Sequence, residues 1–206
     1  MGQYWKLVNI DRRQELRGWG KLGEVFFRRF DDVIELLAGP WAGCRIMCIG
    51  DNMGKCPPDV LISEEATEIK NLPGRSYYSD EDEDSSDADD PSKTLYRLSD
   101  WRYKEIESTE YVNLRGMVLR NLTKHVYVRR DVVIEELKRS GRGGDIGNIL
   151  LTDICWSEDS SCAMMLDLSR GGWAGVVPLS SVEDEEEEWE DVTGDQVKLT
   201  RFALRR

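Results

Sequence analysis

The sequence contains one short pattern twice, and this repetition constrains the fold more than any other feature. The first copy, GPWAGCRIMCIGD, covers residues 39–51, and the second, GGWAGVVPLSSVE, covers residues 171–183. In each copy an apolar run follows the tryptophan, and a carboxylate comes ten residues after it. Short apolar runs next to Gly and Pro are typical of buried strands. We therefore predict an internal duplication, with Trp41 and Trp173 on equivalent strands that each end in a carboxylate.

A second similarity supports the duplication. Residues 7–12, Leu-Val-Asn-Ile-Asp-Arg, match residues 119–124, Leu-Arg-Asn-Leu-Thr-Lys, in type at most positions. Residues 4–10 alternate between aromatic, polar and aliphatic side chains, which predicts a strand followed by a turn. Residues 117–130 predict two short strands around a turn near Lys124.

Three helices are predicted from apolar spacing and from helix-end signals. Within residues 20–38, apolar side chains lie three or four positions apart and form one stripe of an amphipathic helix, which the following Gly-Pro should end. Asp131 is a suitable N-cap for a helix that ends near Arg139. A further helix is predicted near residues 94–106.

Together these elements predict an α+β fold in a single domain over residues 1–206. Two similar strand–helix–strand halves, at about residues 1–75 and 111–206, should share one mixed or antiparallel sheet. Residues 55–75 are polar and broken by proline and glycine, so loops with short pieces of structure are expected there. Further strand is expected near residues 148–156.

The acidic residues are concentrated in two runs. Residues 80–90 and 183–191 each hold eight acidic residues and no basic one, in a chain with 40 acidic residues, 28 basic residues and a formal net charge of −12. Outside these runs, 24 acidic residues face 28 basic ones, so the rest of the chain is mildly basic. The first run cannot bury enough apolar surface to become ordered, so residues 79–91 are predicted to be a disordered insertion.

The sequence predicts a soluble, cytoplasmic and monomeric protein without a metal or cofactor. The N-terminus has no apolar signal region, and no stretch approaches the roughly twenty apolar residues that cross a membrane. Five cysteines without metal-ligand spacing and a single histidine argue against a zinc site. Reduced thiols are the expected state of these cysteines.

Arg45 and Asp51, together with Tyr4, are the candidate catalytic residues. Arg45 interrupts an apolar strand, and Asp51 follows it. An arginine and a carboxylate near aromatic rings can hold a flipped base: the rings stack on it, the arginine binds or protonates it, and the carboxylate stabilises positive charge on the sugar. The alternative is a structural, buried Arg45–Asp51 ion pair, and the residues alone do not decide between the two.

Aromatic and basic side chains are the candidate groups for substrate binding. The aromatic candidates are Trp5, Trp41 and Trp173. By default such residues belong to the core. The basic candidates are Arg120, Lys124 and Arg129. They lie in a stretch, residues 115–142, that carries eight basic residues. A basic stripe can contact phosphates, but an ordinary solvated surface fits the same pattern.

Four segments carry a resemblance to a known family. They are MGQYWKLVNIDRRQ at the start of the chain, GPWAGCRIMCIGD, VLRNLTKHVYVR and GGWAG. With these segments the chain resembles, over nearly its whole length, a family of mushroom proteins that begin MGQYWK-VN and have bacterial counterparts. The family pattern is W-A-G-D-R-I with a following G-D-Y. Here Arg45 and Asp51 match the pattern, whereas Cys44 replaces the aspartate and Asn52 replaces the tyrosine.

The group is similar to mushroom ribosome-inactivating proteins of the ledodin type, which remove an adenine from the sarcin-ricin loop of large-subunit ribosomal RNA. The resemblance implies an RNA N-glycosylase, a defence toxin that acts on the ribosome without metal or cofactor. A site that needs the family aspartate would be weakened by Cys44. The alternative is a non-enzymatic cytosolic module that binds another protein through an exposed apolar or charged patch. An enzyme should instead show a concave pocket where an aromatic ring, an arginine and a carboxylate converge.

Overall fold

The computed structural model describes most of the chain. The described residues are 4–16, 20, 21, 24, 31–51, 61–73, 94–107, 113–122, 124–141, 144–147, 149, 150, 155, 156, 172–183 and 188–203. The predicted acidic insertion, residues 79–91, lies outside them, as do residues 184–187 of the second acidic run. Within the described part, no helix is long and apolar enough to cross a membrane.

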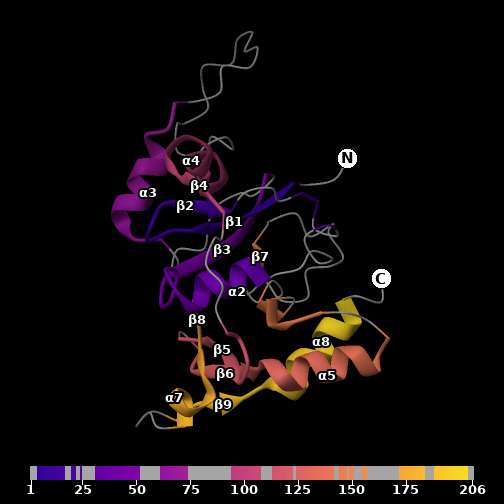
Figure 1. Ribbon diagram of the computed structural model, residues 1–206. Helices are drawn as coiled ribbons and strands as arrows, with labels where there is room; N and C mark the ends of the chain where they lie inside the picture. The colour runs from indigo at the N-terminus through magenta and orange to yellow at the C-terminus, as the bar shows by residue number, and fades with distance from the viewer. Residues whose placement is uncertain are drawn as a thin grey trace.

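The described strands form one nine-stranded sheet in two groups (Figure 1). The strands of the first half are β1 (Trp5–Asn9), β2 (Gln14–Leu16), β3 (Arg45–Gly50) and β4 (Lys104–Ile106). The strands of the second half are β5 (Met117–Asn121), β6 (Val126–Arg129), β8 (Gly172–Pro178) and β9 (Glu190–Asp191). The short strand β7 (Cys155–Trp156) pairs with β3 beside this path.

The order of the strands reads the same from both ends. It runs β4-β2-β1-β3-β8-β5-β6-β9, so β4 corresponds to β9, β2 to β6, β1 to β5, and β3 to β8. Directions correspond as well: β1–β2 and β5–β6 are antiparallel hairpins, β1–β3 and β5–β8 are antiparallel, and β2–β4 and β6–β9 are parallel. The two halves meet where β3 and β8 pair antiparallel. The predicted α+β fold with two similar halves is confirmed.

The two hairpin turns match residue by residue. The Asn9 side-chain oxygen accepts a hydrogen bond from the Arg12 N–H at 2.9 Å, and the Asn121 oxygen accepts one from the Lys124 N–H at 3.1 Å. The next residue in each turn, Arg13 or His125, has a left-handed backbone with φ of 51° or 53°. The predicted match of residues 7–12 with residues 119–124 is therefore the true register of the duplication.

The two WAG segments, in contrast, are not equivalent in the fold. Asn9 pairs with Ile46, and its counterpart Asn121 pairs with Ala174, so Trp173 corresponds to Arg45. Trp173 lies on β8, whereas Trp41 lies in a turn before β3. The physical reason is the Gly-Pro step after the helix, which makes residues 39–43 a turn rather than strand. The prediction that both tryptophans lie on equivalent strands is wrong.

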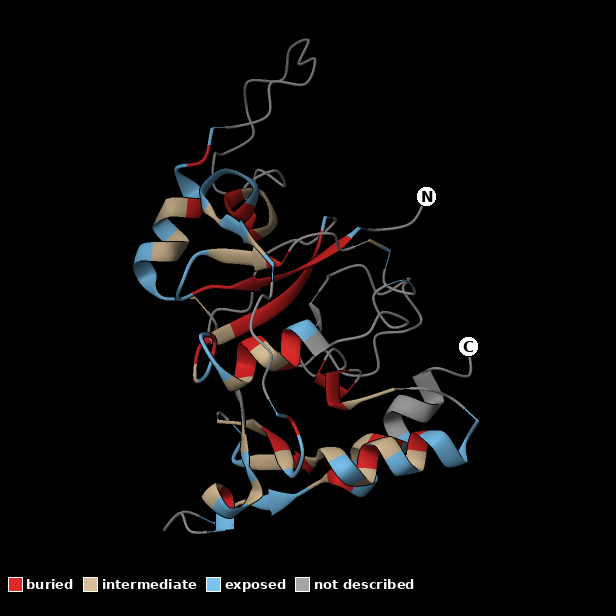
Figure 2. Cartoon of the chain, viewed as in Figure 1, coloured by how far each residue is buried: buried red, intermediate tan, exposed pale blue. Residues whose placement is uncertain are grey.

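Three helices pack on one face of the sheet and make a core common to both halves. They are α2 (Asp31–Ala38), α5 (Arg130–Arg139) and α8 (Thr193–Ala203). Leu37 of α2 and Leu137 of α5 are fully buried in one cluster with Trp5 of β1 and Leu119 of β5. Figure 1 shows α2 between the two groups of strands, and Figure 2 shows that β1 and β3 are buried along their length.

The opposite face of the first half is covered by α3 (Ser63–Lys70) and α4 (Leu95–Arg102). This second cluster is built by apolar side chains from two strands, two helices and a loop: Val8, Ile10, Met47, Ile49, Ile69, Leu72, Leu95 and Leu98. The alternation of side chains along β1 explains why the strand serves two cores: Trp5 and Leu7 face α2, while Lys6 and Val8 face α4.

Several predicted boundaries need correction. The helix expected near residues 94–106 ends at Arg102, because the next residues form β4 and pair with β2. Residues 63–70, expected as loop, form α3. Residues 149 and 150, expected as strand, are helical. Asp131 is not an N-cap: α5 begins at Arg130, and the Asp131 carboxylate instead binds Arg129 at 3.1 Å.

Candidate active site

Tyr4 and Asp51, two of the three predicted catalytic residues, lie side by side. The Tyr4 N–H donates a hydrogen bond to Asp51 Oδ1 at 3.0 Å, and the Asp51 N–H donates to the Tyr4 carbonyl at 2.9 Å. The second bond, between backbone groups, lies one residue beyond the last β1–β3 pair, Trp5 and Gly50, and the first uses the Asp51 side chain. Tyr4 is 52% exposed and Asp51 is exposed, so both can be reached by a ligand.

A buried lysine lies on the same face of the sheet. Lys6 is only 8% exposed, and its ammonium lies 3.0 Å from a Glu15 oxygen and 2.5 Å from an Asp100 oxygen. The ammonium also lies over the ring of Tyr96, 4.0 Å from its centroid. A buried charge is tolerated only when it is paired, and Lys6 is paired with two carboxylates and an aromatic face.

Tyr96 contacts this lysine through its ring. Burial, followed by the nearby carboxylates of Asp100, Asp51 and Glu15, raises the pKa of Tyr96 to about 12. Like any phenol it is protonated at neutral pH and can donate a hydrogen bond. We call the group of residues gathered here the Lys6 cluster. It consists of Tyr4, Lys6, Glu15, Asp51, Tyr96 and Asp100.

Local sequence rules explain why the Lys6 cluster forms. Tyr4 and Lys6 are two positions apart on β1 and therefore lie on one face of the sheet. Tyr96 and Asp100 are four positions apart on α4 and therefore lie on one face of the helix. Thr94 fixes the start of α4, because its hydroxyl accepts a hydrogen bond from the Arg97 N–H.

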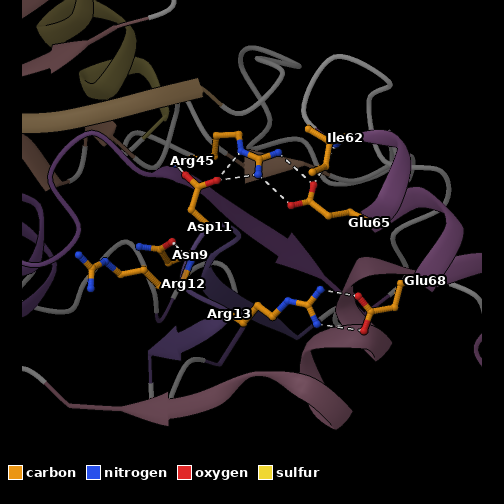
Figure 3. A network of polar contacts seen from close by, with 8 residues as sticks. All are labelled: Asn9, Asp11, Arg12, Arg13, Arg45, Ile62, Glu65 and Glu68. Carbon is orange, nitrogen blue, oxygen red and sulfur yellow. Dashed lines mark hydrogen bonds and ion pairs between the residues drawn. The ribbon is translucent and has the colours of Figure 1, made fainter.

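Arg45, the third predicted catalytic residue, is held elsewhere (Figure 3). Its guanidinium binds Asp11 Oδ1 at 2.6 Å and Glu65 Oε1 at 2.8 Å. Burial lowers the pKa of Arg45, but the hydrogen bonds to Glu65 and Asp11 outweigh burial, and the pKa is raised. Arg45 and Asp51 lie at opposite ends of β3, about 20 Å apart at the ordinary rise per residue. The predicted convergence of these two residues, as a catalytic pair or as a structural ion pair, is therefore wrong.

The predicted tryptophans are not available to a substrate where the structure describes them. Trp5 is 1% exposed and Trp41 is fully buried, and both belong to the core between the sheet and α2. The Trp41 indole N–H donates a hydrogen bond to the Gln14 side chain at 2.8 Å. Trp173 is described by its backbone alone, which pairs with Arg45 in β3. Trp5 and Trp41 are thus structural residues.

The predicted basic residues belong to the second half. Arg120 has its guanidinium 5.4 Å from the centroid of the Trp189 ring, Lys124 is exposed in the turn, and Arg129 binds Asp131. The strands β3 and β8 separate β5 from β1, so the strand that carries Arg120 lies three strand spacings, or about 14 Å, from β1 across the sheet. Arg120 is in addition displaced along the strands, because it pairs beyond the Arg45–Trp173 pair. These residues do not converge with Tyr4 and Asp51.

The described residues contain no group of three or more His, Cys, Asp or Glu that could hold a metal ion. Cys44, which stands where the family pattern has aspartate, is buried, with its thiol 4.0 Å from the Ala42 carbonyl oxygen. It lies before β3, at the end of the strand away from Asp51. Its substitution therefore does not alter the Lys6 cluster.

Four members of the Lys6 cluster were missed by sequence reasoning: Lys6, Glu15, Tyr96 and Asp100. Lys6 could have been recognised from the sequence, because a lysine inside an otherwise apolar strand needs a partner for its charge. The Tyr96–Asp100 spacing was visible as well, but nothing in the sequence showed that α4 packs on β1.

No protein family, curated protein or solved structure that we compared with the chain matches it. The resemblance to the mushroom family therefore stays a prediction that depends on the quoted segments.

Proposed function

We propose that the chain is an RNA N-glycosylase that removes an adenine from ribosomal RNA in the cytoplasm, with the Lys6 cluster as its active site. The observation that carries the proposal is that two exposed residues, Tyr4 and Asp51, are hydrogen-bonded through the Tyr4 backbone, on the face of the sheet that also carries the buried Lys6 ammonium. The resemblance to ribosome-inactivating proteins supports the choice of RNA as substrate.

In this proposal Asp51 stabilises the sugar. Hydrolysis breaks the bond between C1′ of the ribose and N9 of adenine, and the sugar passes through an oxocarbenium-like state with positive charge. A carboxylate at that position stabilises the developing charge more than it stabilises the neutral substrate. The Tyr4 ring stacks on the flipped adenine, because a half-exposed aromatic ring is an open stacking surface.

Other members of the Lys6 cluster accept a proton or donate a hydrogen bond during the reaction. A water molecule forms the new bond to C1′ and loses a proton, and the departing adenine gains one, so the reaction is balanced without a co-reactant. Asp100 is the proposed acceptor of the water proton, and Lys6 holds it in place. The Tyr96 hydroxyl, which is protonated at neutral pH as in any phenol, donates a hydrogen bond to the departing base.

The decisive experiment is depurination of intact ribosomes, read by aniline cleavage of the ribosomal RNA. Asp51→Asn should lower the rate about a hundredfold, because it keeps the size of the side chain and removes the charge. The melting temperature should stay within the range of a control variant, Asp195→Asn, which changes an exposed carboxylate on α8. Full activity in a stable Asp51→Asn protein would exclude Asp51 from catalysis. If the wild-type protein releases no aniline-dependent fragment, the non-enzymatic interaction module becomes the better interpretation.

A further inference from the structure

We propose that the outer face of α4 is an RNA-binding subsite, on which a base flanking the target adenine stacks against Trp101. The residues of this subsite are Arg97, Trp101 and Arg102. The inference rests on the proposed function for the identity of the ligand, but it is carried by a different part of the structure and is tested by binding rather than by turnover.

Trp101 is 57% exposed, the most exposed of the large hydrophobic side chains in the described residues. The apolar packing of α4 is already provided by Leu95 and Leu98, which are each 1% exposed in the second core cluster. The fold therefore gains little from a tryptophan on the outer face. A large exposed aromatic ring without a packing role is typical of a binding surface.

Arg97 lies over this ring. Its guanidinium carbon is 5.7 Å from the Trp101 ring centroid, at the four-residue spacing that brings side chains together on a helix. Among the described residues, Arg97 Nη1 is buried without a hydrogen-bond partner.

The charge on this face suits a nucleic acid. Arg102 extends the surface, with a side chain that is 62% exposed and no closer than 4.0 Å to its ion-pair partner Glu68. The one acid within α4, Asp100, is bound to Lys6 on the neighbouring face. Two arginines that flank an exposed tryptophan form the combination that binds single-stranded RNA, in which arginines contact phosphates and aromatic rings stack on bases.

The subsite adjoins the Lys6 cluster by helix geometry. Tyr96 and Asp100 point to Lys6, and the residues that follow each of them, Arg97 and Trp101, are rotated by about 100° around α4. A strand of RNA bound at the Lys6 cluster would continue over this neighbouring face of α4. The group that the subsite binds is a nucleotide base with its phosphate, and the partner is a single-stranded loop of RNA.

Binding of a short fluorescein-labelled RNA oligonucleotide with the sarcin-ricin loop sequence, followed by fluorescence anisotropy, tests the subsite. Trp101→Ala should weaken the affinity about tenfold or more, and Trp101→Phe should retain part of it, because a smaller ring still stacks. Arg97→Met should weaken the affinity and lower the slope of log affinity against log salt by about one. The matched control is Ile62→Ala, which truncates another exposed hydrophobic side chain, 51% exposed, beside the Arg45 network.

The outcomes separate the subsite from the proposed function. An affinity of Trp101→Ala equal to that of Ile62→Ala overturns the subsite, whatever the depurination assay shows. If Trp101→Ala and Arg97→Met weaken RNA binding while Asp51→Asn remains fully active, the subsite stands and the catalytic assignment fails. Melting temperatures of the variants identify any loss of RNA affinity that comes from unfolding. If Trp101→Ala is unfolded, the affinity of Trp101→Phe decides whether the subsite exists, because this variant keeps an aromatic ring at position 101.

Discussion

At the scale of single residues, two buried basic side chains dominate the first half of the sheet. Lys6 and Arg45 lie on neighbouring strands, and each is held by two carboxylates. They differ in what surrounds them: Lys6 adjoins the exposed Tyr4 and Asp51, whereas Arg45 closes a network between β3, the first turn and α3. The ion pairs of Lys6 thus belong to the candidate site, whereas those of Arg45 stabilise the fold.

Arg45→Met should destabilise the protein without removing its activity. The Arg45 side chain is 12% exposed, so the substitution leaves Asp11 and Glu65 partly buried and without their cation. Loss of one partner from a buried ion pair typically costs about 3 kcal/mol. Urea unfolding should show this loss, while depurination per folded molecule should stay close to that of the wild type. An Arg45→Met protein that is stable but inactive would restore Arg45 to the catalytic group.

Two partly buried tyrosines predict how stability depends on alkaline pH. Burial raises the pKa of Tyr96 to about 12 from an ordinary value of 10.0, and it also raises the pKa of Tyr103. Above about pH 10 the unfolded chain releases these phenolic protons while the folded chain keeps them, so stability falls as the pH rises. Melting temperatures measured from pH 9 to pH 12 should therefore decline less steeply in Tyr103→Phe than in the wild type.

The sequence predicted part of the site and missed the rest for a physical reason. Asp51 follows an apolar strand and Tyr4 begins the strand that pairs with it, so their neighbourhood depends only on a two-strand register. The prediction that Arg45 lies next to Asp51 was wrong, because the two residues lie at opposite ends of β3. The contributions of Tyr96 and Asp100 depend on how α4 packs across the sheet, and packing between distant segments leaves no local signal.

At the scale of elements, the two hairpins are the clearest trace of the duplication. Both turns use an asparagine oxygen to bind a backbone N–H three residues on, and both place the following residue in the left-handed region. The side chain of an asparagine imitates one more backbone carbonyl and closes such a turn locally. This explains why the short match between residues 7–12 and 119–124 was informative, whereas the longer WAG match was not.

Asn9→Ala and Asn121→Ala should each lower stability by about 1 kcal/mol, the typical net value of one hydrogen bond. Asn9 is fully buried, so its replacement should be the more costly of the two. The control is Arg12→Ala, which keeps the backbone N–H that donates to Asn9. Guanidinium unfolding measures all three. If only one of the two asparagine substitutions lowers the free energy of unfolding, the two turns differ in their contribution to stability despite their shared geometry.

The helix and strand errors lie where tertiary contacts override local preference. Residues 94–106 were predicted to form one helix. Instead, Lys104–Ile106 pairs with the edge of β2 as a parallel strand. A parallel partner distant in sequence leaves no pattern in the strand itself. By contrast, the β5–β6 hairpin was predicted well, and α2 lies within the predicted helix of residues 20–38, because their periodicity and turn chemistry are local. The predicted start of that helix is wrong: Gly20 and Lys21 are not helical, and Lys21 forms a β-bridge with Tyr4.

At the scale of the whole molecule, the two halves share a framework but not a site. The backbone contact between Tyr4 and Asp51 has a counterpart, in which the Leu179 N–H donates to the Gly116 carbonyl at 3.2 Å. The register also places Val118 at the position of Lys6. The second half therefore has a glycine, a leucine and a valine where the first half has a tyrosine, a carboxylate and a lysine. The proposed chemistry belongs to the first half alone.

The shared core predicts that the two halves unfold together. Leu37 of α2 and Leu137 of α5 are both fully buried in one apolar cluster, which also contains residues of β1 and β5. Leu37→Ala and Leu137→Ala should each cost about 2–5 kcal/mol, because a buried leucine leaves a cavity when it is truncated. Each variant should shift a single urea transition, with tryptophan fluorescence and far-UV circular dichroism coincident. Two separate transitions, with each substitution moving only one of them, would instead mean that the duplicated halves are independent folding units.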